Sequence, residues 1–160
     1  MSNLDLPDRK RPARCSPLDY GNRSVILFVT VCTKDRKPVL ASVIGFSAIV
    51  SAWRGAAAWT VGRFVIMPDH VHLFCSPANN AFSIQSWVKF WKSSVSRRWI
   101  DPAIRPIWQV QMWDTQIRSG DSYDAKWDYV RNNPVRHGLV RHSEEWPFKG
   151  ELNPLSWHDP

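Results

Sequence analysis

The sequence lacks a long hydrophobic run, and no apolar stretch approaches the roughly 20 residues that a helix needs to cross a bilayer. Its first residues, MSNLDLPDRKRPAR, also lack the apolar region of a secretory signal peptide. Cysteine is scarce: Cys15, Cys32 and Cys75 are an odd number, lie far apart and form no CxxC pair. This pattern excludes a disulfide framework. We therefore predict a cytoplasmic protein with no membrane partner.

Acidic residues are also in the minority. The chain has 14 Asp and Glu against 21 Lys and Arg, which gives a net charge of +7. That balance fits nucleic acid, an anionic surface or another acidic partner. At 160 residues and 44% hydrophobic, the chain is long enough to fold as one domain with a core. Most of its ten tryptophans must be buried, and a minority could stack on unpaired bases.

The chain divides into a basic, proline-rich arm (residues 1–20), one folded domain (21–148) and a polar tail (149–160). Hydrophobic periodicity predicts four strands and three helices in the domain. The order β-α-β-β-α-β, followed by an extra helix, predicts an α+β fold. We expect a ferredoxin-like antiparallel sheet (split βαβ) with helices packed on it. The expected strands are 24–33, 60–67, 70–75 and 107–113, and the expected helices are 39–55, 81–99 and 122–132.

The strongest local signal is His70-Val71-His72 in the third expected strand. Residues i and i+2 of a strand project from one face, so both imidazoles can reach one divalent ion. The alternative is two histidines that only pack or form hydrogen bonds. Cys75 has the opposite parity, which argues against a structural zinc site that uses all three.

The second signal is Tyr129 with Asn133, in DYVRNNPVRHGLV. Four residues apart on a helix, they would lie on one face and present a hydroxyl together with an amide oxygen. Taken alone, Tyr129 is better explained as an ordinary tyrosine of a helix surface or core. Tyr20 lies in the arm, and Tyr123 is turned about 240° around the helix from Tyr129, so both are weaker nucleophile candidates.

Taken together, MPDHVHLF and, some 60 residues later, YVRNNPVRHGLV resemble the single-tyrosine HUH transposases. The resemblance covers roughly residues 22–147 and is to the REP-associated tyrosine transposase branch of the IS200-like, insertion-sequence-type family. It includes FVTVCTKDRKPVL and IWQVQMWDTQIRSGD.

The resemblance implies a metal site on a central strand, with His70, His72 and Asn133 as ligands, and a catalytic Tyr129 on a helix that swings over it. It also implies an enzyme that nicks single-stranded DNA at an imperfect hairpin and rejoins it through a 5′-phosphotyrosine. The expected cofactor is Mg²⁺ or Mn²⁺. A monomer and a homodimer both remain open. The chain departs from the usual pattern at His137, where a small residue is common, and at Thr115, where a His is frequent.

Lysines and arginines are the candidates for contacts with DNA phosphates. Trp87 and Trp91 are instead assigned to the core. The phosphate-contact candidates are Arg9, Lys10, Arg11, Arg14, Lys89, Lys92, Arg97, Arg98, Arg118 and Arg131.

Two other functions compete with the nicking enzyme. One is a non-catalytic regulator that binds hairpin nucleic acid and retains the fold. The other is a metal-dependent phosphodiesterase that uses water and forms no protein adduct. The presence of two histidines, an asparagine and a tyrosine at workable spacing favours the nicking enzyme.

Overall fold

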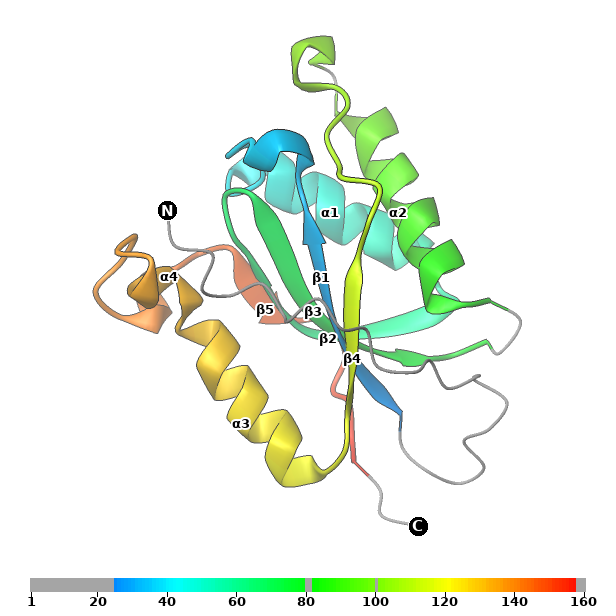
Figure 1. Cartoon of the computed structure of the whole chain (residues 1–160), viewed down its shortest axis with the longest axis vertical. Helices are drawn as coiled ribbons and strands as arrows, with labels where there is room; N and C mark the ends of the chain where they lie inside the picture. The colour runs from blue at the N-terminus through cyan, green and yellow to red at the C-terminus, as the bar shows by residue number, and fades with distance from the viewer. Residues whose placement is uncertain (1–24, 80–81, 100, 158–160) are drawn as a thin grey trace.

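A computed structural model of the chain describes residues 25–79, 82–99 and 101–157. Their centre is a five-stranded sheet in the order β4-β1-β3-β2-β5, in which every neighbouring pair is antiparallel (Figure 1). The first four strands have the order expected of a ferredoxin-like sheet, which confirms the predicted fold class. The strands are β1 (Ile26–Cys32), β2 (Trp59–Ile66), β3 (His70–Pro77), β4 (Trp113–Ile117) and β5 (Lys149–Glu151).

Helices cover both faces of the sheet. The helices α1 (Val43–Gly55) and α2 (Ile84–Arg98) pack on one face, and α3 (Gly120–Arg131) lies on the other (Figure 1). A short helix, α4 (Asn133–Arg136), follows α3 directly. Each of the three long helices begins at a serine cap. The side-chain oxygens of Ser42, Ser83 and Ser119 accept from the backbone N–H three residues further on, which satisfies one otherwise unpaired donor of the first turn.

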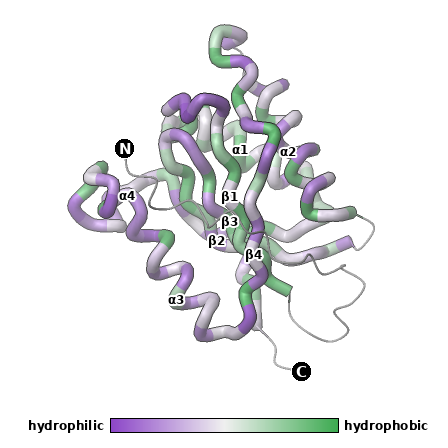
Figure 2. The backbone as a smooth tube through the Cα atoms, in the orientation of Figure 1, coloured by the Kyte–Doolittle hydropathy of each residue, from purple (hydrophilic) through white to green (hydrophobic). Residues whose placement is uncertain are grey.

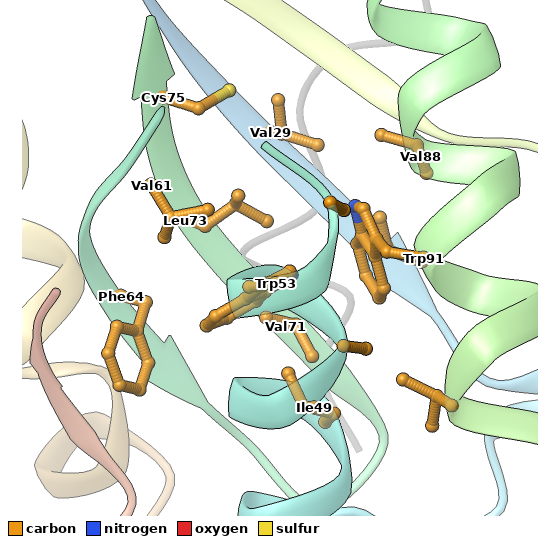
Figure 3. Packing of buried hydrophobic residues seen from close by; sticks show 14 of the residues in the cluster. Val29, Ile49, Trp53, Val61, Phe64, Val71, Leu73, Cys75, Val88 and Trp91 are labelled. Carbon is orange, nitrogen blue, oxygen red and sulfur yellow. The ribbon is translucent and has the colours of Figure 1, made fainter. Parts of the chain in front are cut away.

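Strand parity divides the core into two layers. The larger layer lies between the sheet and α1 and α2, where Trp53 and Trp91 point toward the sheet residues Val29, Val71 and Leu73 (Figure 3). The smaller layer lies under α3. Figure 2 shows the hydrophobic residues concentrated in the central strands and α1, whereas α3 is mostly pale or hydrophilic. A mostly hydrophilic α3 is consistent with a helix that buries only a narrow stripe.

The smaller layer joins alternate residues of β1 and β3 to the inner face of α3. Phe28 and Phe74 contact each other in the sheet, and Tyr123 and Val130 are the buried residues of α3. The ring of Tyr123 meets the ring of Phe74 edge to face, with 5.0 Å between ring centres. These contacts hold α3 on the face of the sheet to which His72 also belongs by parity.

The predicted strand at 107–113 is wrong: the fourth strand is β4, Trp113–Ile117. The apolar residues that suggested the earlier strand are buried from an irregular segment. Trp108 forms an isolated bridge with Thr33, and its indole N–H donates to Lys92 O at 3.2 Å. Lys92 Nζ in turn donates to Gln109 O at 2.6 Å. Two backbone hydrogen bonds, from Lys34 N–H to Ile107 O and from Gln109 N–H to Cys32 O, together with Lys92 thus satisfy this segment without a strand ladder.

The sheet also extends further along the chain than the sequence predicts. Lys149–Glu151 forms β5, which pairs with β2, although residues 149–160 were expected to be a tail. The arm at residues 1–20 lies outside the described residues. Within the part that the structure describes, no helix is long and apolar enough to cross a membrane.

Candidate metal and tyrosine site

His70 and His72 lie on β3, the central strand of the sheet, and face α3. Both side chains are buried, and their Nε2 atoms are 3.2 Å apart. Val71 and Cys75 belong to the core layer under α1 and α2, on the opposite face, which confirms the predicted parity. Two imidazole nitrogens that share an ion at about 2.1 Å are roughly 3.0 to 3.4 Å apart. The observed separation is therefore suited to a shared cation.

The other ring nitrogen of each histidine has a fixed partner. His70 Nδ1 lies 2.8 Å from Asp69 Oδ1, and Asp69 Oδ2 accepts from Arg36 Nε at 2.8 Å. His72 Nδ1 lies 2.9 Å from Thr30 Oγ1. An ionised carboxylate can only accept, so His70 is protonated at Nδ1 and presents a lone pair at Nε2. Ordering of the distal nitrogen in this way is a common feature of metal-binding histidines.

Burial keeps both imidazoles neutral. It lowers the pKa of His70, although the hydrogen bond and the charge of Asp69 oppose the effect. It lowers the pKa of His72 further, and the neighbouring His70 adds to this. Burial would raise the pKa of Asp69, but the hydrogen bonds from His70 and Arg36 outweigh it and leave the pKa well below the usual value. The site thus combines neutral imidazoles with one charged carboxylate behind them.

Cys32 lies opposite His70 in the register of β1 and β3. Burial raises the pKa of its thiol to about 11, and its sulfur is 3.6 Å from Arg36 Nη1. It therefore stays a neutral thiol directed at the arginine.

Asn133 joins the histidine pair from α4. Its side chain is fully buried, and Nδ2 lies 3.3 Å from His70 Nε2. Its Oδ1 is buried and has no hydrogen-bond partner among the described residues. A turn of about 180° at the amide exchanges these two atoms and presents the oxygen to the imidazoles. A buried, unpaired amide oxygen beside two imidazole nitrogens fits a divalent cation, and it is what a site of these three residues requires.

Asn133 does not share a continuous helix with Tyr129, contrary to the prediction. The helix α3 ends at Arg131, and α4 begins at Asn133. Pro134 explains the break, because it has no N–H for Val130 O and its ring would clash with that carbonyl. The break turns Asn133 into the interior, while Tyr129 stays 48% exposed.

Two positively charged side chains lie near the ring of Tyr129. The guanidinium carbon of Arg136 lies 3.7 Å from the centre of the Tyr129 ring, and Lys126 Nζ lies 5.5 Å from it. Arg136 also donates to the backbone oxygen of Tyr129. Lys126 Nζ is 4.6 Å from the ring centre of Phe28, which stacks on His72 with 5.2 Å between ring centres. The tyrosine ring is thus linked to the histidine pair through Lys126 and Phe28.

The basic residues that were predicted to contact DNA phosphates do not lie together at this site. The α2 residues Lys89, Arg97 and Arg98 are exposed on a helix that packs on the opposite face of the sheet. Lys92 is half-buried and bonded to backbone carbonyls. On the face of α3, Arg131 pairs with Asp128 at 3.1 Å.

The remaining basic candidates are placed as follows. Arg118 is exposed between β4 and α3. The arm residues Arg9, Lys10, Arg11 and Arg14 lie outside the described residues, as do Tyr20 and Cys15.

Sequence reasoning missed Lys126, Arg136, Asp69 and Thr30. Lys126 could have been found from its helical spacing of three residues before Tyr129, and Asp69 from its place directly before His70. Thr30 becomes a neighbour of His72 only through the register of β1 and β3. The sequence alone does not predict that register.

We expect Asp69→Asn to weaken binding of Mn²⁺ roughly tenfold to hundredfold, because the substitution removes the charge that orients His70 and attracts a cation. Isothermal titration calorimetry on the purified chain measures this. Asp35→Asn is the matched control, since Asp35 is exposed and lies beside Arg36 in the short 3-10 helix Lys34–Arg36. Equal affinities for Asp69→Asn and the wild type would contradict the role of Asp69.

The family model described as "Transposase IS200 like" matches residues 23–132. The REP-associated tyrosine transposase of Escherichia coli (strain K12) is 28% identical over 105 residues, which are 61% of this chain and 61% of that protein. A relative from Haemophilus influenzae, named for the same transposase group, is 27% identical over 111 residues, 58% of this chain and 62% of that protein. The chain thus spans about three fifths of the curated relatives that it matches.

A solved structure has a similar fold. It is described as a REP-associated tyrosine transposase bound to a REP hairpin, and it superposes with a TM-score of 0.67 at 22% sequence identity. The match covers 90% of this chain and 82% of the other. At this identity, the likeness bears on the fold alone.

Proposed function

Because the chain belongs to the IS200-like transposase family, we propose that it nicks and rejoins single-stranded DNA beside a hairpin, with Tyr129 as nucleophile and a divalent metal at His70, His72 and Asn133. The observation that carries this proposal is the 3.2 Å approach of two buried Nε2 atoms next to the unpaired amide oxygen of Asn133. This cluster belongs to the face of the sheet that α3 covers, and α3 bears Tyr129.

Two imidazoles and an amide oxygen are the proposed ligands of Mg²⁺ or Mn²⁺. Within residues 25–79, 82–99 and 101–157, no three His, Cys, Asp or Glu side chains form a metal-binding group, so the site depends on the asparagine. When bound, the cation would relieve charge on a non-bridging phosphate oxygen and stabilise the leaving 3′ oxygen.

In the proposed reaction, the hydroxyl oxygen of Tyr129 attacks the phosphorus of the scissile phosphodiester. A bond from this oxygen to phosphorus forms, and the bond from phosphorus to the 3′ oxygen breaks. The tyrosine loses its proton and the 3′ oxygen gains one, which gives a 5′-phosphotyrosine and a free 3′-OH. Attack by another 3′-OH reverses these changes and rejoins DNA, with no external energy source because the phosphotyrosine conserves the bond.

Lys126 and Arg136 have supporting roles in this reaction. The guanidinium of Arg136 lies over the ring of Tyr129 and donates to the backbone oxygen of Tyr129, so it holds the nucleophile in place. Lys126 lies between that ring and Phe28, beside His72, where its charge is available to an incoming phosphate. The cytoplasmic location remains a prediction.

The proposed substrate is single-stranded DNA with an imperfect, REP-like hairpin. A perfectly paired duplex constrains its backbone, which leaves a phosphodiester less able to reach both Tyr129 and the histidine pair. The alternative is a regulator that binds the hairpin without cutting it. The buried histidine pair beside the unpaired amide oxygen of Asn133 favours the enzyme, because a pure binding protein does not need a metal site.

Cleavage should require a single strand next to a hairpin, and a fully paired duplex of the same sequence should stay intact. Hairpin oligonucleotides taken from repeats that flank the gene, incubated with Mn²⁺ and resolved on denaturing gels, measure this. Binding should weaken steeply as salt rises, since phosphate contacts release counterions. Equal cleavage of the duplex, or affinity that does not change with salt, would count against the proposal.

A further inference from the structure

The outer side of α2 carries a line of exposed side chains. This helix lies on the opposite side of the sheet from α3, and its buried residues all face the sheet and α1 (Figure 1). Helix residues that follow a first one by three, four, seven and eleven positions lie on the same side as that residue. The exposed α2 residues with this spacing form what we call the α2 stripe: Ser86, Lys89, Phe90, Ser93 and Arg97.

The α2 stripe is positively charged, and its charge is not neutralised by carboxylates. Neither α1 nor α2 contains an Asp or a Glu. Arg97 Nη1 donates to Ser93 Oγ at 2.9 Å, and no ion pair involves Lys89 or Arg97 within residues 25–79, 82–99 and 101–157. On α3, by contrast, Arg131 pairs with Asp128 at 3.1 Å. A neutral serine thus orients Arg97 and leaves its full charge for an anionic partner.

Phe90 is the one apolar side chain of the α2 stripe, and it is 54% exposed. Folding does not require this ring at the surface, because Trp87 and Trp91 already fill the core side of the helix. Phe90 lies next to Lys89 and about two turns before Arg97. An exposed aromatic ring between cations is the arrangement that binds unpaired nucleic acid, in which a base stacks on the ring and the cations contact phosphates.

We propose that the α2 stripe binds an unpaired stretch of DNA, with a base stacked on Phe90 and phosphates at Lys89 and Arg97. Because α2 and α3 cover opposite faces of the sheet, this stretch is separate from the phosphodiester that Tyr129 attacks. The choice of DNA rests on the proposed function, whereas binding of an unpaired strand does not require cleavage. An anionic membrane surface fits less well, because the apolar side of α2 is buried in the core.

Binding of a fluorescent oligo(dT) without a hairpin tests this proposal, by anisotropy on the full chain with no metal added. We expect Phe90→Ala and Phe90→Leu to weaken binding roughly fivefold or more, because both lose the stacked ring. Phe90→Tyr keeps the ring and should bind as the wild type does. Lys89→Gln/Arg97→Gln should lower the slope of log affinity against log salt by roughly 1.4, because two phosphate contacts are lost.

Two exposed residues outside the α2 stripe supply matched controls. Val43→Ala removes an apolar side chain of α1 that is 79% exposed, and Arg141→Gln removes one exposed charge beyond α4. Both variants should keep the affinity of the wild type for oligo(dT). Unchanged affinity in Phe90→Ala, or a loss in Phe90→Tyr as large as in Phe90→Ala, overturns the inference. So does equal weakening by Lys89→Gln and Arg141→Gln, which indicates only a general effect of charge.

Two further measurements separate this inference from its alternatives. If the wild type forms no adduct at Tyr129 while Phe90→Ala still loses affinity for oligo(dT), the proposed function fails and the α2 stripe stands as a DNA-binding surface. If Phe90→Ala keeps its affinity for oligo(dT) but no longer binds vesicles of phosphatidylserine, the surface is a membrane contact and the inference is overturned.

Discussion

Tyr129→Phe is expected to abolish the covalent complex between protein and DNA and to slow cleavage roughly a thousandfold or more, as loss of a nucleophile does in other covalent enzymes. The substitution removes one oxygen and keeps the ring on which Arg136 stacks. Because Tyr129 is 48% exposed, stability and hairpin binding should barely change. The measurement is an SDS gel of protein incubated with labelled hairpin DNA and Mn²⁺.

Two other tyrosine variants serve as controls for this experiment. Tyr123→Phe should still form the adduct, because Tyr123 is buried and packs against Phe74. Tyr20→Phe should do so as well. A binding protein would give no adduct in any variant. A hydrolase that uses water would cut normally with Phe at position 129, and either outcome would exclude the proposed mechanism.

The double variant His70→Ala/His72→Ala should lose cleavage almost completely while it still binds hairpin DNA. Both imidazoles are proposed metal ligands, and metal assistance contributes several kcal/mol to the transition state, which corresponds to roughly a thousandfold in rate. EDTA should have the same effect on the wild type, and added Mn²⁺ should reverse it. Single-turnover cleavage assays and gel-shift binding measure the two properties separately.

His142→Ala is the matched control for this double variant, since it removes an exposed histidine that lies outside the proposed metal site. The double variant also empties a buried site, so its circular dichroism must match that of the wild type before rates are compared. Cleavage at the wild-type rate in a folded double variant would remove the metal site from the mechanism.

Local periodicity was enough to predict the parts of the site that lie on single elements. The alternation of His70, Val71 and His72 predicted which side chains share a face, and Cys75 lies on the other face as its parity required. The buried stripe of α2 was equally visible, because Trp87 and Trp91 recur at helical spacing and both are in the core.

Non-local features could not be predicted in this way. The apolar run at 107–113 looked like a strand, but its backbone is satisfied by Lys92 and by the bridge to Thr33. The basic residues of α2 were plausible phosphate contacts, yet the topology puts that helix on the face opposite the histidines. Arg36, which donates to Asp69, has a left-handed backbone conformation (φ 54°), and no local sequence pattern predicted this conformation.

The identity of the residue bonded to DNA tests the central claim most directly. The wild-type adduct with hairpin DNA and Mn²⁺ is digested with protease and nuclease, and the modified peptide is sequenced by mass spectrometry. We expect the nucleotide on Tyr129, attached through a 5′ phosphate and derived from the DNA piece that lies 3′ of the nick. A nucleotide attached to any other residue, or its persistence in Tyr129→Phe, would contradict the account.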